Sequence, residues 1–188
     1  MNSSANTVRR SWDDACMEAL KEIIQYANYM PSPTLEDMDE INDALASFVR
    51  DPLRADAKYV VDLMKRAASI SIHTILDSGQ CWDTEEMWLL LCKKQSDYGH
   101  GNINNFGLAG VAVRLCDKIA RAKNLEARGG VFSVSNETLR DTYEDIVGYA
   151  TIAVMLRDDT FKYDLEDAAE VYASTERITP TAQGEIIQ

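Results

Sequence analysis

The sequence has few of the residues that interrupt helices. Among its 188 residues there are only four prolines and nine glycines, and these two are the strongest breakers of regular structure. Apolar and polar residues alternate nowhere over a length typical of a strand, except in the short GVFSV segment at 130–134. The scarcity of breakers and of strand patterns predicts an all-α protein.

Basic residues and soft metal ligands are also scarce. The chain has 19 Lys and Arg against 31 Asp and Glu, a net charge of −12. This charge argues against a broad nucleic-acid-binding surface, because phosphate neutralisation supplies most of that affinity. Only two histidines occur, and no CxxC pair, so no zinc site can be assembled at the usual spacings. We expect reduced, buried thiols at Cys16, Cys81, Cys92 and Cys116.

Long apolar segments are missing as well. No uninterrupted run approaches the ~20 apolar residues that span a bilayer, and the first fifteen residues lack the apolar stretch of a secretory signal. We therefore expect a cytoplasmic protein with no membrane partner and no nucleic-acid partner. An acidic chain can still bind a small anion, since a nucleotide held through divalent cations requires local carboxylates.

Helical periodicity is what the sequence does contain. Apolar residues recur at steps of three and four in six segments, and Ser, Thr or Asp precedes several of them as a potential cap. A seventh short helix is possible at 164–172, and the tail from about 174 is expected to be loosely docked. The sequence thus predicts a bundle of six to seven helices, the six covering 8–29, 34–49, 56–76, 85–98, 108–127 and 137–157.

The segment KKQSDYGHGNINNFG at 93–107 concentrates hydrogen-bonding groups between two predicted helices. Lysines in a last helical turn are favourable on their own, and glycines commonly end helices. The density of polar groups beyond that points instead to a nucleotide-binding turn whose glycines let the backbone approach the ligand. Candidate residues are Lys94, Asp97, Tyr98, Gly99, His100, Asn102 and Asn105.

The predicted helix at 108–127 carries a cationic edge. Arg114, Lys118 and Arg121 recur at steps of three and four, opposite an apolar stripe. Arg is suited to bidentate contact with phosphate, whereas Lys acts more as a point charge. The alternative is a solvated face with an ion pair between Asp117 and Arg121, which contributes ~0.2–0.5 kcal/mol.

The predicted helix at 137–157 carries a row of carboxylates. Glu137, Asp141 and Asp145 are spaced four residues apart, and like charges at this spacing oppose helix formation. Divalent cations would reverse that cost, because Mg²⁺ takes hard oxygen ligands. Near a helix N-terminus, however, Glu137 and Asp141 are favourable without any metal. Gly148 indicates close helix approach or ligand access, and Tyr149 either stacks on a base or packs.

Taken together, these three segments resemble a known family. K-x-x-D-Y-G at 94–99, R-x-x-D-K-x-x-R-x-x-N-L at 114–125 and N-E-x-L-x-D-T-x-x-D-x-x-G-Y-A at 136–150 resemble the "nucleotide modification associated domain 1" family of phages and bacteria. The resemblance covers roughly residues 82–157. That family looks related to the all-α nucleotide pyrophosphohydrolases of MazG type, which implies a MazG-like core in the C-terminal two-thirds.

The resemblance implies a metal site, with departures from the MazG pattern. MazG-type proteins place E-x-x-E on one helix and E-x-x-D on another around Mg²⁺, usually in a dimer. Here the second half is Asp141-x-x-x-Asp145, and the helix at 85–98 has no E-x-x-E. By resemblance, the ligands of Mg²⁺ or Mn²⁺ would be Glu86, Asp117, Glu137, Asp141 and Asp145, in a homodimer or a higher homo-oligomer.

The activity implied by the resemblance is Mg-dependent hydrolysis of a (deoxy)nucleoside triphosphate to nucleoside monophosphate and pyrophosphate, for example in the nucleotide pool of a phage-infected host cytoplasm. Lys94, Arg114, Lys118 and Arg121 would neutralise the developing charge. Substrate contacts would come from Asp97, Tyr98, Gly99, His100, Asn102, Asn105, Asn124 and Tyr149.

Two other functions stay open on the sequence alone. The first is a non-catalytic protein that binds or sequesters a nucleotide, which the incomplete E-x-x-E motif favours. The second is a helical interaction protein whose charged faces are only solvated. Residues 1–80 are expected to form a helical extension packed on a nucleotide-binding core at 81–160, followed by a short helix and tail at 161–188.

Overall fold

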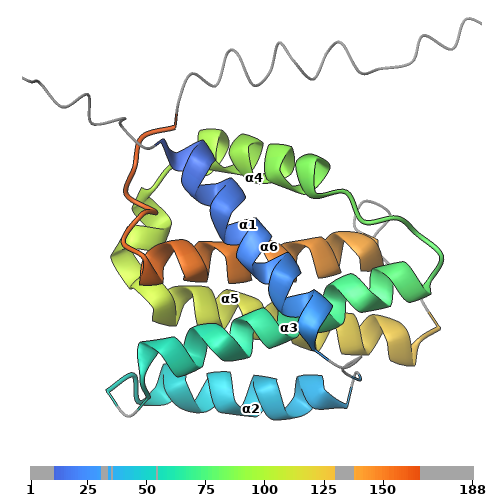
Figure 1. Cartoon of the computed structure of the whole chain (residues 1–188). Helices are drawn as coiled ribbons and strands as arrows, with labels where there is room; N and C mark the ends of the chain where they lie inside the picture. Colours follow the sequence, from blue (N-terminus) through green and yellow to red (C-terminus); the bar gives the residue numbers. More distant parts are fainter. Residues whose placement is uncertain (1–10, 31–33, 35, 54, 130–137, 166–188) are drawn as a thin grey trace, which may run out of the picture.

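The computed structural model describes residues 11–30, 34, 36–53, 55–129 and 138–165. All regular structure in these residues is helical, as the sequence predicts, and the all-α fold is confirmed. The GVFSV segment, Glu137 and most of the predicted seventh helix lie outside the described residues. The helices are α1 (Trp12–Tyr29), α2 (Asp37–Arg50), α3 (Ala57–Asp77), α4 (Thr84–Tyr98), α5 (Gly101–Ala127) and α6 (Leu139–Arg157), shown in Figure 1.

Several helices begin where a short polar side chain can satisfy the first backbone amides. Asp83 accepts hydrogen bonds from the backbone N–H groups of Glu85 and Glu86 at 2.9 and 3.1 Å, which fixes the start of α4. Ser11 and Asp56 cap α1 and α3 in the same way. These caps explain why the predicted starts of α3 and α4 agree closely with the structure.

The sequence predicts a single turn within the segment 93–107, but most of this segment is helical in the structure. The turn is limited to Gly99, at φ 61°, and His100, and α5 already begins at Gly101. A second non-helical residue, Gly107 at φ 53° and ψ −146°, divides α5 into a short first part and a long second part. The predicted helix start at Leu108 therefore marks this kink, and the asparagines before it are helical.

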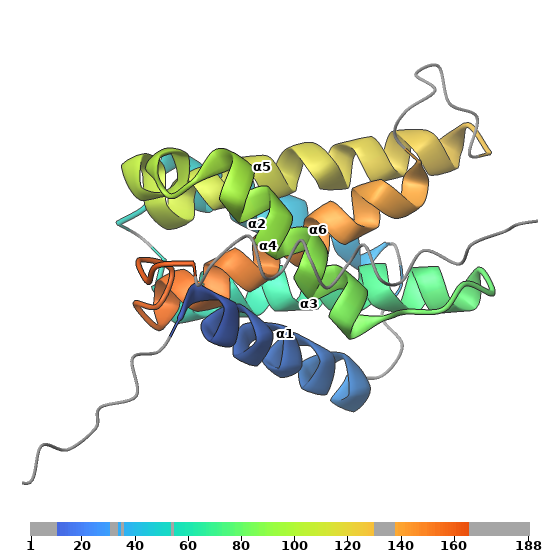
Figure 2. The ribbon, with the colours of Figure 1, turned by 90° about the horizontal axis from the view of Figure 1, so that it is seen from above.

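The core is shared by helices from both halves of the chain. Helix α3 packs along α6, and α1 crosses both of them, as Figures 1 and 2 show. Buried residues on these helices, including Leu20, Ile70 and Ile146, belong to one hydrophobic cluster. Residues 1–80 thus supply part of the same core, and the predicted boundary near residue 80 stays a prediction.

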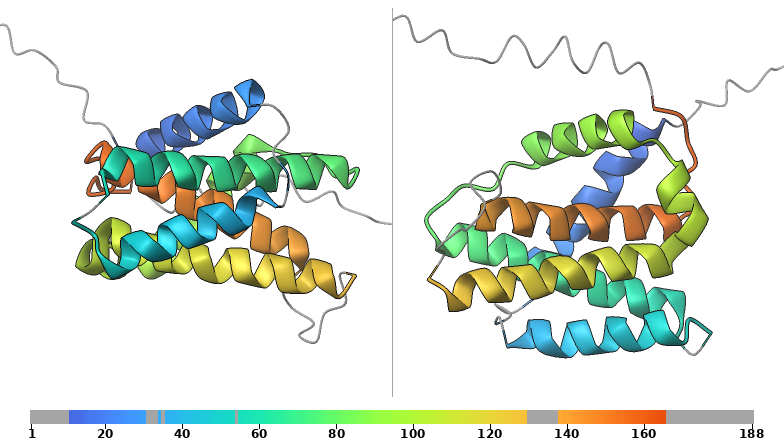
Figure 3. Two further views of the ribbon diagram at one scale, coloured as in Figure 1. Left: turned by 90° about the horizontal axis from the view of Figure 1, so that it is seen from below. Right: turned by 180° about the vertical axis from the view of Figure 1, so that it is seen from behind.

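Helix α6 packs against α1, α3, α4 and α5. In the rear view of Figure 3, α6 lies between α4 and α5, and no helix crosses in front of it. Its opposite side packs against α1 and α3. Residues 139–156 of α6 are buried or partly buried, and Asp141, Asp145 and Tyr149, which the sequence predicts to be functional, are partly buried.

The four cysteines differ in how far they are buried. Cys16 and Cys92 are buried, and burial raises the pKa of Cys92 to about 12. Cys81, however, is exposed, because it precedes α4 in a loop, so the prediction of four buried thiols is wrong at this position.

Among the described residues, no helix is both long enough and apolar enough to cross a membrane.

Candidate functional site

The centre of the candidate site is one carboxylate held by two lysines. Asp145 lies in the second turn of α6, Lys94 comes from α4 and Lys118 comes from the middle of α5. Lys94 Nζ lies 2.5 Å from Asp145 Oδ1, and Lys118 Nζ lies 2.7 Å from Asp145 Oδ2. Three residues predicted from separate segments are therefore brought together, and we call them the Lys94–Asp145–Lys118 cluster.

The cluster lies at the edge of the core. The side chains of Asp145 and Lys118 are 20% and 23% exposed, and that of Lys94 is 40% exposed. Burial raises the pKa of Asp145, but hydrogen bonds from Lys118 and Lys94 outweigh this effect and lower the pKa below its ordinary value. An ionised carboxylate thus neutralises one of two adjacent cations, which leaves the cluster with a net positive charge.

The two arginines of the cationic edge differ in their surroundings. Arg114 lies one turn before Lys118 on α5 and is exposed. Arg121, one turn further along, donates from Nε to Thr142 Oγ1 on α6 at 3.1 Å. Arg121 therefore contributes to the contact between α5 and α6, whereas Arg114 extends the positive surface of the cluster towards solvent.

The predicted metal ligands do not converge around Asp145. Asp141 accepts a hydrogen bond from the backbone N–H of Thr138 at 2.6 Å, while Thr138 Oγ1 accepts from Asp141 N–H, which is a capping box. Glu86 lies near Arg140 and helps to raise the pKa of that guanidinium, after Glu144. Asp117 is exposed on α5. Within the described ranges, no three acidic, His or Cys side chains form a group that could hold a metal ion.

The fit of Asp145 to Mg²⁺ depends on its two lysines, because each carboxylate oxygen already accepts a hydrogen bond from one of them. The carboxylate favours the ionised form and is partly shielded from water, and a metal could reach it only if these lysines moved away. Mg²⁺ is commonly bound through one or two carboxylates together with phosphate oxygens and water, without a cage made only of protein. The described residues thus place one carboxylate, Asp145, at this position, and Glu137 lies outside them.

Most of the predicted substrate-contacting residues surround the turn between α4 and α5. Tyr98 is 79% exposed. Gly99 is partly exposed, and Tyr149 on α6 packs partly against the core. The others have exposed side chains and are Asp97, Asn102, Asn105 and Asn124.

His100 has a structural partner. Its Nε2 donates to the backbone carbonyl of Tyr163 at 2.9 Å, and its ring contacts Phe161 edge to face at 5.4 Å. Phe161 in turn contacts Trp12, whose backbone N–H donates to Asp164 O at 2.9 Å. His100 therefore fixes the turn after α4 to the segment that follows α6, which explains its presence without a ligand.

Gly148 provides the close approach of α4 to α6. A Cβ atom at this position would lie 3.0 Å from Leu91 Cδ2 and 3.4 Å from Met87 Cε. Both neighbours lie on α4, the helix that carries Lys94. The missing side chain thus lets α4 come near enough for Lys94 to reach Asp145, three residues before Gly148.

Two residues of interest were missed by the sequence reasoning. Gln95, next to Lys94, is buried, yet its amide Nε2 has no hydrogen-bond partner among the described residues. Phe106, at the end of the first part of α5, is 67% exposed. An amide and an aromatic ring have no charge pattern that singles them out, so only their burial and exposure reveal them.

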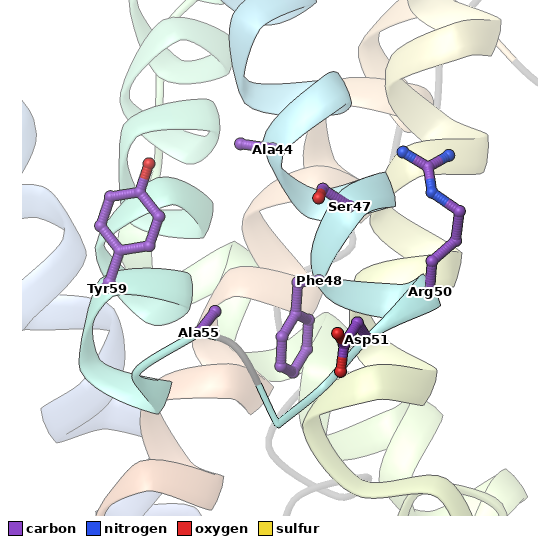
Figure 4. Close-up of a pocket in the computed structure, with 7 residues that line it drawn as sticks. All are labelled: Ala44, Ser47, Phe48, Arg50, Asp51, Ala55 and Tyr59. Atoms are coloured by element: carbon purple, nitrogen blue, oxygen red, sulfur yellow. The ribbon is translucent and has the colours of Figure 1, made fainter.

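A shallow hollow elsewhere on the surface does not coincide with the predicted site. It has a volume of about 430 Å³ and lies where α2 turns into α3, with Phe48 and Tyr59 on its two sides (Figure 4). Its other lining residues are small or charged, and none was predicted to be functional. The Lys94–Asp145–Lys118 cluster, and not this hollow, is the candidate functional site.

Comparison with known proteins adds no assignment: no family model matches this chain, and no significant match is found among curated proteins or solved structures.

Proposed function

We propose that this protein binds a nucleoside triphosphate at the Lys94–Asp145–Lys118 cluster and hydrolyses it to nucleoside monophosphate and pyrophosphate. The observation that carries the proposal is the convergence of two lysines from different helices on a single ionised aspartate. Glu22 is also shared by two cations, but there Lys65 and Arg157 contact Asp62 and Asp158 as well, whereas the ion pairs of Lys94 and Lys118 are with Asp145. A polyanionic ligand would use the surplus charge.

The lysines would bind the phosphate chain and neutralise the charge that develops on it during hydrolysis. Arg114, exposed one turn away on α5, would add a bidentate contact to the same phosphates. Because the phosphates and Asp145 need the same lysine donors, ligand binding would weaken the ion pairs within the cluster. Asp145 would then be available as a ligand for Mg²⁺.

Mg²⁺ would be held by Asp145 together with substrate phosphates, and when bound it supplies a Lewis acid that polarises the phosphorus centre and lowers the pKa of a coordinated water. The residues of the chain itself bind the phosphates, limit the access of water from the side of the core and keep α4 close to α6 at Gly148.

Non-catalytic nucleotide binding is the second candidate function. It is favoured by the capping role of Asp141 and by the lack of a group of three potential metal ligands in the described part of the chain. A protein with this function would hold the phosphates through Lys94 and Lys118 and release the nucleotide unchanged. The two candidates share a binding site and differ only in turnover.

The test is to incubate the purified chain with each of the common ribonucleoside and deoxyribonucleoside triphosphates, with Mg²⁺ or Mn²⁺, and to measure pyrophosphate. The expected result is turnover of at least one nucleotide that is lost in Asp145→Asn. Asp43→Asn is the matched control, since Asp43 is an exposed aspartate on α2. This control variant should keep full activity.

Thermal unfolding with and without nucleotide separates the remaining outcomes. A ligand that binds only the folded state raises the melting temperature by mass action. Nucleotide-dependent stabilisation without pyrophosphate release supports the non-catalytic protein. If no nucleotide changes either the melting temperature or the pyrophosphate signal, both candidate functions are wrong.

A further inference from the structure

An exposed aromatic ring lies on α5, the helix that carries Lys118 of the candidate site. Phe106 is 67% exposed although a benzyl side chain gains free energy from burial. It ends the short first part of α5, directly before the kink at Gly107. The neighbouring asparagines, Asn102, Asn104 and Asn105, are exposed as well. This part of α5 therefore presents a ring and hydrogen-bonding amides to solvent.

Two glycines hold Phe106 in this position. Gly107 adopts φ 53°, a left-handed conformation that other residues adopt only with strain. A Cβ atom on Gly110 would lie 2.5 Å from Phe106 Cβ and 3.5 Å from Phe106 Cγ, which is too close for any side chain at Gly110. The kink and the missing side chain thus let the base of the phenylalanine side chain lie directly on the helix surface.

Phe106 lies on the same face of α5 as Arg114 and Lys118, two residues of the cationic edge. Gly110, Arg114 and Lys118 are spaced four residues apart, so they follow one another along a single face of α5. From Gly110 to Lys118 the helix rises by about 12 Å, two turns. Phe106 lies at one end of this face, and the Lys94–Asp145–Lys118 cluster lies at the other.

We infer that Phe106 is the stacking surface for the base of the nucleotide whose phosphates occupy the Lys94–Asp145–Lys118 cluster. The inference rests on the proposed function and names the residue that binds the non-phosphate part of that ligand. Base-on-ring stacking tolerates every base, because each has a π face. Asn104 and Asn105 are the side chains nearest in sequence that can distinguish the base edges by hydrogen bonds.

The test compares a nucleotide with inorganic tripolyphosphate, which has the phosphates but no base. Affinities of the full chain for both ligands are measured by calorimetry, using the nucleoside triphosphate that binds wild-type protein best. Phe106→Ala should weaken nucleotide binding about 5- to 150-fold and leave tripolyphosphate binding unchanged. Phe106→Trp should bind the nucleotide at least as well as the wild type, because a larger ring stacks better.

Two further variants exclude a merely structural effect. Gly110→Ala keeps the ring but displaces it, and should also weaken nucleotide binding selectively. Tyr29→Ala removes another exposed ring, 88% exposed at the end of α1, and should change neither affinity. Equal affinities of wild type and Phe106→Ala for the nucleotide, or equal losses for both ligands in that variant, would overturn the inference while the proposed site stands. If wild-type protein binds neither ligand, the proposed function fails and this inference fails with it.

Discussion

Helices α3 and α5 use their residues in opposite ways. Twelve of the 21 residues of α3 are buried, against five of the 27 in α5, so α3 serves mainly the core and α5 mainly the surface. The buried stripe of α5, Val111, Leu115 and Ile119, is just wide enough to pack on α6 and α2. The rest of α5 is therefore available for binding, and it contributes Lys118 and the exposed Arg114 to the candidate site.

The comparison extends to polar contacts. Among α1, α3 and α6, Glu22 accepts hydrogen bonds from Lys65 and from Arg157. These two cations also contact Asp62 and Asp158, so the charges are balanced. On the α4–α5 side, the cations outnumber the carboxylate that they contact. Balanced charge is typical of structural ion pairs, and surplus charge of one sign is typical of a binding site.

The largest expected effect comes from removing core volume in α3. Ile70→Ala should lower the free energy of unfolding by about 2–5 kcal/mol, because Ile70 is fully buried and a cavity adds to the lost transfer energy. Val113→Ala on α5, where the side chain is 42% exposed, should change it by less than ~0.5 kcal/mol. Urea unfolding of both variants measures the contrast, and similar losses would show that α5 is as important for the core as α3.

The charge surplus of the candidate site gives the second prediction. Asp145→Asn should destabilise the fold by about 1–2 kcal/mol, because two partly exposed lysines lose their common counter-ion. Inorganic tripolyphosphate, without metal, should restore more stability to this variant than it adds to the wild type. Thermal unfolding at several anion concentrations measures this difference.

Lys118→Gln is the matched control for that experiment, since it removes one of the two phosphate-binding cations. Its melting temperature should respond to tripolyphosphate less than that of the wild type. A larger response in Lys118→Gln than in Asp145→Asn would place the anion elsewhere on the surface.

The core around α1 and α3 is more predictable from the sequence than the side formed by α4 and α5. The buried stripes of α1 and α3 follow directly from apolar residues at steps of three and four. Asp56 and Asp83 are N-cap residues and indicate where α3 and α4 begin. These features are local, because each depends on residues within one or two turns of the same helix. Local patterns are what a single sequence can specify.

The α4–α5 side depends on contacts between distant segments. Lys94, Lys118 and Asp145 are predicted to share one site only through the family resemblance, and the structure brings these three together. The sequence does not predict that Asp141 completes a capping box, since a carboxylate near a helix start suits both roles. It also gives no indication of Phe106, because the exposure of that ring follows from the kink at Gly107 and not from any periodicity.

The third prediction uses pH to examine the balanced charges among α1, α3 and α6. Hydrogen bonds from Arg157 lower the pKa of Glu22 to about 2, against about 4.3 in an unfolded chain, with a smaller contribution from Lys65. Because the folded-state pKa is the lower one, the stabilisation is present above about pH 4.5 and is lost as the pH falls towards 2. The side chain is a third exposed, so we expect at most ~1 kcal/mol.

Glu22→Gln should therefore be less stable than the wild type at pH 7, and the difference should disappear as the pH approaches 2. Unfolding curves recorded across this range measure it. A difference between the two proteins that stays constant from pH 7 to pH 2 would contradict the assigned charge of Glu22, because loss of packing alone does not depend on its protonation.

The smallest expected effect concerns the joint between the two regions, where α4 lies against α6 at Gly148. Alanine has a higher helix propensity than glycine, by up to ~1 kcal/mol in a helix interior. At Gly148 the new Cβ would lie 3.0 Å from Leu91 Cδ2, on a side chain that is almost fully buried, so packing strain opposes this gain. We expect Gly148→Ala to lower the free energy of unfolding by less than ~1 kcal/mol, as measured by urea unfolding.

Gly101→Ala is the control, because its Cβ would enter open space at the start of α5 and should not destabilise the protein. A gain in stability for Gly148→Ala equal to that of Gly101→Ala would mean that α4 does not need its close approach to α6, and the distance between Lys94 and Asp145 would then have to be maintained by the ion pair alone.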